Sequence, residues 1–185
     1  MTERQKMLAG ELYWANDSEL VTLRDRARAL FEAYNRTYHA HPEAGRAILR
    51  ELLAPYPGPI DIQAPFYCDY GHNLHVGKNF FANFNLQVLD CAKITIGDNV
   101  MFGPNVQLYT AYHPLPARER LRGPELAAPI VIEDNCWLGG GVIVCQNVTI
   151  GANTTIGAGS VVVKDIPANV FAAGNPCRII RELEA

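Results

Sequence analysis

Residues 132–162 read IEDNCWLGGGVIVCQNVTIGANTTIGAGSVV. In this stretch an aliphatic residue recurs every six positions, in a series formed by Ile132, Leu138, Val144, Ile150, Ile156 and Val162. A second series, four places after each member of the first, is mostly small or β-branched and holds Cys136, Val142, Val148, Thr154, Ser160 and Ile166. Neither the period of a helix nor that of an ordinary strand produces this pattern.

A six-residue period is typical of a parallel β-helix. Each repeat supplies a short strand with an inward aliphatic side chain, followed by a tight turn where Gly or Asn tolerates a positive φ. Three repeats make one triangular coil, and successive coils stack their aliphatic side chains along the axis. A β-sandwich would instead show turn signals about every 8–12 residues. The sequence therefore predicts a mainly β protein built as a parallel β-helix.

The same phase occurs earlier, at residues 96–100 (IGDNV) and 102–106 (FGPNV), with a cruder copy at 76–80 (VGKNF). We expect the phase to be lost at about residues 80–94 and again over residues 111–129. The second interruption has 19 residues, with four prolines and five charges. Because a long loop inside a compact repeat is usually functional, we expect residues 111–129 to project and to wall part of a site.

Residues 1–57 lack the six-residue repeat and show helical spacing instead. They predict a helical N-terminal segment ahead of a β-helix domain at residues 58–185. An apolar stripe at helical spacing holds Leu20, Leu23, Ala27, Leu30, Phe31, Tyr34 and Tyr38. Asn16, Asp17 and Ser18 are candidate N-caps for that helix. Pro42 suits the first turn of a further short helix, and three prolines within residues 55–59 end the segment.

Composition limits the classes of partner. The net charge of −3 gives no reason to expect nucleic acid or an anionic membrane as the main partner. Residues 135–163 carry no charge, but six glycines argue against a transmembrane helix. The N-terminus does not resemble a secretory signal. Five scattered cysteines without a C-x-x-C pair argue against a disulfide framework or a zinc knuckle, so a reduced, cytoplasmic setting is the simplest interpretation.

Several short motifs together carry a resemblance to a known family. They are residues 6–13 (KMLAGELY), 68–71 (CDYG), 79–85 (NFFANFN), 96–99 (IGDN), 110–114 (TAYHP), 137–140 (WLGG), 156–162 (IGAGSVV) with Lys164-Asp165, and 174–180 (GNPCRII). The chain resembles the hexapeptide-repeat acyltransferases and, among them, the maltose and galactoside O-acetyltransferases. The resemblance covers nearly the whole chain. The helical start and the context of His113 make it more specific than the repeat alone.

The resemblance implies a left-handed β-helix, a homotrimer with active sites between subunits, acetyl-CoA as donor and the hydroxyl of a small sugar such as maltose, glucose or a galactoside as acceptor. It implies no metal. Galactoside-type relatives have a hydroxyl residue where Asp69 stands and an acidic residue where Cys91 stands. These departures leave the identity of the sugar open.

Acetyl transfer from a thioester to a hydroxyl needs a base, and His113 matches the family's position for it. Histidine titrates near neutral pH, and a general base contributes typically about 10²–10⁴-fold. Without the family, a loop histidine with no role is the alternative. The expected mechanism is direct attack of the sugar hydroxyl on the thioester with no acetyl-enzyme, because no cysteine has an evident partner base.

Three polar residues match positions beside the acetyl group and the acceptor. Asn83 is expected to hold the acceptor or to stabilise the oxyanion, and it also matches a donor contact. It could instead be a turn residue, and periodicity does not distinguish it from Asn85. Asp17 and Asp69 are expected to hold acceptor hydroxyls. For Asp17, a helix N-cap is the alternative.

The acetyl-CoA groove is expected at residues that match the family's donor contacts: Asn83, Gly140, Ala158, Val163, Lys164, Arg178 and Arg181. The cations suit phosphates, although surface basic residues are common. A glycine at position 140 is also compatible with a tight corner. Trp137 either stacks on the donor or packs against the protein.

Other functions share the repeat. A γ-type carbonic anhydrase would need three histidines on zinc, for which His72, His75 and His113 are the only trio, and the paired H-x-x-x-x-H is absent. A non-catalytic trimeric scaffold would not depend on His113. The same chemistry on an antibiotic or a lipo-oligosaccharide is a further alternative. Serine acetyltransferases have a much longer helical N-terminal region.

Overall fold

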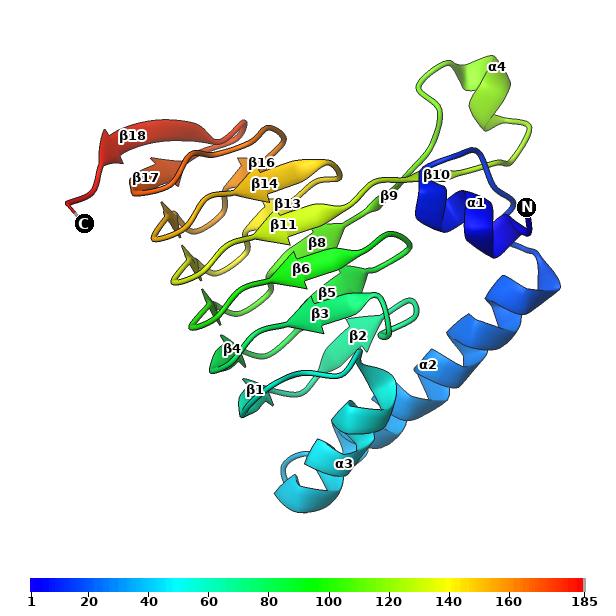
Figure 1. Cartoon of the computed structure of the whole chain (residues 1–185), viewed down its shortest axis with the longest axis horizontal. Coiled ribbons are helices and arrows are strands. Elements are labelled where there is room, and N and C mark those ends of the chain that lie inside the picture. The colour runs from blue at the N-terminus through cyan, green and yellow to red at the C-terminus, as the bar shows by residue number, and fades with distance from the viewer. Residues whose placement is uncertain (185) are drawn as a thin grey trace.

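The computed structural model describes residues 1–184, with four helices and eighteen strands in that part of the chain. Its architecture is the predicted left-handed parallel β-helix, of about six turns. Figure 1 shows the coils stacked along one axis, with the helical N-terminal segment beside the first coils and a hairpin projecting away from them.

Three parallel sheets form the sides of the prism. The first side contains β1 (Ile60–Ile62), β4 (Phe80–Ala82), β7 (Met101–Phe102), β12 (Trp137–Leu138), β15 (Thr155–Ile156) and β17 (Val170–Ala173), and β18 (Arg178–Glu182) pairs antiparallel with β17. The second side contains β2 (Phe66–Cys68), β5 (Leu86–Leu89), β8 (Gln107–Tyr109), β13 (Ile143–Val144) and β16 (Val161–Val162). The third side contains β3 (Leu74–Val76), β6 (Ile94–Ile96), β11 (Ile130–Ile132) and β14 (Val148–Ile150).

The core follows the six-residue pattern. Leu138 pairs with Phe102 on one neighbouring coil and with Ile156 on the other, and all three are buried. Every member of both sequence series is buried as well. Stacked aliphatic side chains therefore fill the prism, and their burial is the main favourable term for the fold.

Asparagine ladders form the turns. Asn79, Asn99, Asn135, Asn153 and Asn169 lie on successive coils at the corner between the third and first sides, each with a φ of 57–59°. Each side-chain amide donates to the next asparagine's Oδ1 at 2.9–3.0 Å. Asparagine tolerates this left-handed conformation, so these positions confirm the turn prediction.

The first predicted interruption is wrong over most of its length. Residues 80–89 form β4 and β5 in register with the neighbouring coils, with Ala82 and Val88 buried. The six-residue phase shifts only after Val88. The next inward residue on the third side that continues the series is Ile96, eight positions later instead of six, so this corner holds two extra residues. The second interruption is confirmed and leaves from the same corner, one coil later. It contains β9 (Ala111–Tyr112), α4 (Ala117–Arg120) and β10 (Leu126–Ala127), and β9 and β10 form an antiparallel pair.

The N-terminal segment closes one end of the prism. It contains α1 (Glu3–Ala9), α2 (Ser18–Thr37) and α3 (Pro42–Leu52), so the predicted apolar stripe lies on one helix. Ala27 and Tyr34 share a core with Ile62 and Phe66 of the first coil, and Asn35 exchanges hydrogen bonds with the Phe66 backbone at 2.8 and 2.9 Å. The division at residue 57 falls between α3 and β1. Because both parts share this core, two separate domains remain a prediction.

No helix in residues 1–184 is both long enough and apolar enough to span a membrane.

Candidate active site

A cleft lies where the projecting hairpin meets the N-terminal segment and the corner between the second and third sides. Its walls come from four separate parts of the chain: Tyr13, Ala15, Arg24, Asp69, Leu89, Cys91, Ala111, Tyr112, His113 and Glu125. We call it the hairpin cleft. The structure thus brings together two of the predicted site residues, His113 and Asp69.

The hairpin positions His113. This residue directly follows β9 and is exposed, whereas the next residue, Pro114, is buried and restricts the local backbone. In the β9–β10 pair Tyr112 lies opposite Leu126, so the next position of the antiparallel register sets Glu125 opposite His113. An imidazole and a carboxylate therefore face the same cleft from adjacent segments.

Tyr13 ties the hairpin to the N-terminal segment. Its backbone exchanges two hydrogen bonds with the backbone of Glu125, at 2.9 and 3.0 Å, and its hydroxyl donates to Glu125 Oε2 at 2.9 Å. Tyr13 is fully buried, and burial raises the pKa of its hydroxyl, so the group stays a donor. The sequence alone does not reveal this contact, because its partners lie 112 residues apart.

Asp69 forms the opposite wall with Cys91 and Arg24. Burial raises the pKa of the Asp69 carboxyl, while the Cys91 thiol, 3.5 Å from Oδ2, and the Arg24 guanidinium lower it. Arg24 itself is held by hydrogen bonds to the Tyr70 hydroxyl at 2.8 Å and to the Ala15 carbonyl at 2.6 Å. The wall thus presents a carboxylate and a fixed guanidinium, two groups suited to binding hydroxyls.

A buried carboxylate supports this wall from behind. Asp90 is fully buried and accepts hydrogen bonds from the backbone N–H groups of Asp69 at 3.1 Å, Tyr70 at 2.8 Å and Asn73 at 3.3 Å. Burial raises the pKa of Asp90 to about 7. These bonds fix the corner that presents Asp69 to the cleft.

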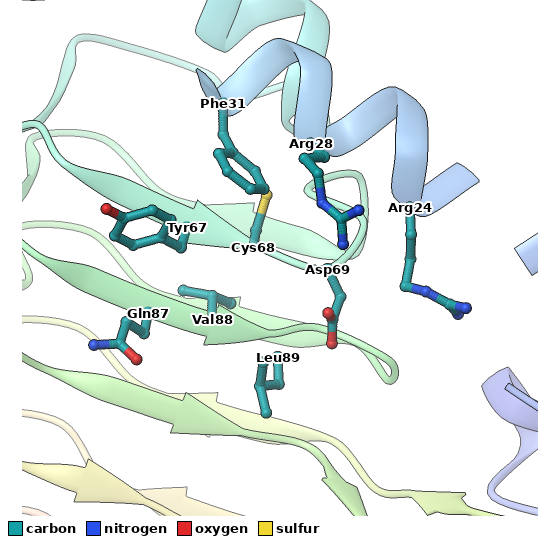
Figure 2. Close-up of a pocket in the computed structure, with 9 residues that line it drawn as sticks. All are labelled: Arg24, Arg28, Phe31, Tyr67, Cys68, Asp69, Gln87, Val88 and Leu89. Carbon is teal, nitrogen blue, oxygen red and sulfur yellow. The ribbon is translucent and has the colours of Figure 1, made fainter. Parts of the chain in front are cut away.

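A second pocket adjoins the hairpin cleft between α2 and strands β2 and β5 (Figure 2). We call it the helix pocket. Its lining residues are Arg24, Arg28, Phe31, Tyr67, Cys68, Asp69, Gln87, Val88 and Leu89. Arg24, Asp69 and Leu89 also line the hairpin cleft, so the two hollows are adjacent.

Asn83 lies at a different corner of the prism. It precedes β5, whereas the hairpin leaves from the far end of the second side. A four-residue strand spans roughly 13 Å, so one chain does not bring His113 and Asn83 together. The structure does separate Asn83 from Asn85: Asn85 has a φ of 65° and donates to Asn105, as a corner residue does. Asn83 accepts only from the adjacent Phe84 N–H, at 2.8 Å.

Asp17 occupies the N-cap of α2, where its Oδ1 accepts from the Glu19 N–H at 3.0 Å. The helix N-cap, which the sequence left open as the alternative role of Asp17, is thus observed. Asp17 is not among the residues that line the hairpin cleft, although Ala15 is. Its predicted contact with an acceptor stays a prediction.

Two of the predicted donor residues lie at the same corner as Asn83. Gly140 and Ala158 lie there on neighbouring coils, where the Gly140 carbonyl accepts from the Gly159 N–H at 2.9 Å. Close stacking demands glycine at the preceding position, since a Cβ on Gly139 would lie 2.7 Å from the Ala158 nitrogen.

The charged donor residues lie at two separate places. Arg178 and Arg181 are exposed on β18, and the adjacent Cys177 N–H donates to the Val161 carbonyl at 2.9 Å. Val163 and Lys164 follow β16 and are exposed at the other end of the second side. Trp137 is 52% exposed on the first side, so it does not pack in the core.

Within residues 1–184, no group of three or more His, Cys, Asp or Glu side chains is arranged to hold a metal ion. His75 lies on β3 of the third side, and His72 is partly buried beside Tyr70. Neither lines the hairpin cleft with His113. The trio that a carbonic anhydrase would need is therefore not assembled within one chain.

Comparisons with known proteins agree with this geometry. Residues 6–57 match the maltose acetyltransferase hexapeptide capping motif, and residues 129–164 match the bacterial transferase hexapeptide repeats. Galactoside O-acetyltransferase of Escherichia coli K12 is 42% identical over 99% of this chain and 89% of its own length.

Two solved structures are also similar. A maltose O-acetyltransferase from Clostridium difficile 630 is 50% identical, with a TM-score of 0.97 over 100% of this chain and 99% of the other. A hexapeptide-repeat acetyltransferase from Vibrio cholerae O1 biovar eltor, solved with acetyl coenzyme A, is 40% identical with a TM-score of 0.91 over 100% of both chains. The chain therefore belongs to the hexapeptide-repeat acetyltransferases, in the group that contains the galactoside and maltose O-acetyltransferases.

Proposed function

We propose that the protein transfers the acetyl group of acetyl-CoA to a hydroxyl of a small sugar such as glucose, maltose or a galactoside, and that it acts in a reducing, cytoplasmic setting. The observation that carries the proposal is the hairpin cleft, which His113, Asp69 and the fixed guanidinium of Arg24 line together. The 40% identical acetyltransferase solved with acetyl coenzyme A supports the donor.

In the proposed reaction the acceptor lies in the hairpin cleft with its hydroxyls on Asp69. The His113 imidazole takes the proton of the reacting hydroxyl, whose oxygen attacks the thioester carbonyl. The Asn83 amide donates to the oxygen that gains charge. As the tetrahedral intermediate collapses, the C–S bond breaks, and the proton passes to the leaving CoA sulfur. The products are the acetylated sugar and free CoA.

The cysteines do not suit a covalent acetyl-enzyme. Burial raises the pKa of Cys91, Cys145 and Cys136, to about 11 for Cys136. The thiolate is the nucleophilic form of cysteine, and it is scarce at neutral pH when the pKa is raised. Direct transfer therefore fits these residues better than a two-step route.

The donor arm would follow the corner that holds Asn83, Gly140 and Ala158, and the cations of Lys164, Arg178 and Arg181 would meet its phosphates. Gly140 and Ala158 offer backbone groups along an edge without bulky side chains. Val163 completes the apolar part of this groove. These contacts are predictions that follow the family match.

We further propose a homotrimer. Asn83 and His113 lie at opposite ends of the second side, so a threefold arrangement that turns this side towards the axis would bring Asn83 of one subunit to His113 of the next. The same arrangement would bring Lys164 to Gly140 and Arg178 of a neighbour. The outward residues of β8, β13 and β16 carry no charge and thus suit burial: Gln107, Tyr109, Ile143 and Val161.

A charge on this face should break the assembly. Ile143 points outward from β13, and Ile143→Asp would place three carboxylates near one axis in a dry interface. We expect a monomer by sedimentation equilibrium and loss of transferase activity, because a buried unpaired charge costs several kcal/mol. Val131→Asp is the matched control, since Val131 points outward from the middle of β11 on the third side. A trimeric Ile143→Asp protein, or a monomeric wild type, would contradict the proposed interface.

The reaction itself is tested by release of CoA thiol from acetyl-CoA with a panel of acceptors: glucose, maltose, a β-galactoside, an aminoglycoside and chloramphenicol. We expect turnover with at least one sugar and little with the two antibiotics. Mass spectrometry of the product should show one added acetyl group. If only an antibiotic is acetylated, acetyl transfer stands and the sugar acceptor is wrong. If the folded protein releases no CoA thiol with any acceptor, the proposal is wrong.

A further inference from the structure

The helix pocket has no part in the transfer described above, yet it lies next to the hairpin cleft. The two hollows share Arg24, Asp69 and Leu89. A ring bound in the hairpin cleft against Asp69 would therefore have its far end at the mouth of the helix pocket. An acceptor longer than one ring has room to continue there.

The helix pocket carries a cation that the protein does not bind tightly. Figure 2 shows Arg28 reaching from α2 towards Asp69, whereas the Arg24 guanidinium turns away from it. Arg24 is already held by Tyr70 and Ala15. Arg28 meets Asp25 at 3.7 Å, with both side chains more than 60% exposed. Such a surface pair contributes little, so the Arg28 guanidinium can bind a ligand at small cost.

The remaining walls suit the face of a ring. Phe31 and Tyr67 meet edge to face, with ring centroids 5.6 Å apart, and Gln87 lies on the next strand beside Tyr67. Aromatic walls with a few polar groups are typical of small-molecule sites. Arginine adds a planar fork that matches a carboxylate with two parallel hydrogen bonds.

We infer that the helix pocket is a second acceptor subsite, and that it binds an acidic sugar ring whose carboxylate pairs with Arg28. The ring to be acetylated would lie in the hairpin cleft, one glycosidic bond away. The preferred acceptor is then a two-ring sugar with a uronic acid as its second ring. This inference rests on the proposed function, because it extends the same acceptor site.

The test compares two acceptors of equal size. One is a glucosyl-glucuronate disaccharide and the other is the primary amide of that glucuronate, which lacks the charge. For the wild type we expect kcat/KM to be about tenfold higher with the acid, because a hydrogen bond between two charged groups is stronger than one to a neutral amide. Calorimetry should show the same preference in binding. Added salt should reduce it, since ions screen a half-exposed pair.

Variants locate the effect. In Arg28→Gln we expect the acid and the amide to be used equally. Arg36→Gln is the matched control: Arg36 lies on the same helix, outside the pocket, and its exposed guanidinium pairs with Glu32 at 3.9 Å. The preference should survive there.

The outcomes separate the two proposals. If the wild type acetylates glucose but uses and binds acid and amide equally, the second subsite is wrong and the transferase stands. A preference that survives Arg28→Gln would also overturn the subsite. If no acceptor is acetylated, the proposed function fails, and the subsite fails with it.

Discussion

His113→Ala is expected to lower kcat for acetyl transfer to the best sugar of the panel by about 10²–10⁴-fold, because a positioned general base contributes that much. The side chain is exposed on the hairpin and sits at the mouth of the cleft. Its removal should therefore leave folding intact, so that the midpoint of thermal unfolding changes little. The measurement is CoA thiol release at saturating acetyl-CoA and sugar.

The matched control for this loss is His75→Ala. His75 is a partly exposed histidine within β3 on the third side, away from the hairpin cleft. We expect near wild-type turnover from it. Turnover with sugars that survives in His113→Ala would leave the family assignment in place and remove His113 as the base. Loss in both variants would indicate a general effect on the fold.

The repeat made the fold predictable because every step of it is local. An aliphatic residue every six positions fixes which side chains point inward, and Asn or Gly at the next corner permits the turn, as Asn135 does with a φ of 59°. Residues 80–89 obey the same geometry with fewer signals. Their inward residues are Phe80, Ala82, Leu86 and Val88, and no Ile-Gly pair marks the step. The pattern therefore weakens there, although the backbone register does not.

The candidate site was predictable only in part. His113 and Asp69 stand in short motifs, so each could be named from its neighbours. Glu125 and Tyr13 lie far apart in the sequence, and only the folded hairpin joins them. From the sequence, Arg24 is one of several charged residues on the polar face of a helix. Only its hydrogen bonds to Tyr70 and Ala15 in the structure show that it is held in place. The distance between Asn83 and His113 likewise emerges only from the coil geometry.

That distance leads to the second large effect, in mixed assemblies. We expect Asn83→Ala to lower activity strongly, because loss of one oxyanion donor typically costs about 10²–10³-fold in kcat. When equal amounts of Asn83→Ala and His113→Ala subunits are co-expressed and assemble at random, activity should return to about a quarter of the wild-type value. A site between subunits takes His113 from one chain and Asn83 from its neighbour. Each of these is intact half of the time, so one site in four is complete.

The control keeps the mixing and removes the complementation. Co-expression of His113→Ala with the double variant Asn83→Ala, His113→Ala yields trimers in which no subunit supplies His113, and activity should stay at the level of the single variant. Two affinity tags select the mixed trimers before the assay. Selection removes the two inactive homotrimers, and each mixed trimer has one complete site in three, so the selected sample should show about a third of the wild-type activity. If mixed trimers of the two single variants are no more active than either parent, each site lies within one chain. Asn83 and His113 would then not belong to the same active site, because they lie at opposite ends of the second side of the chain.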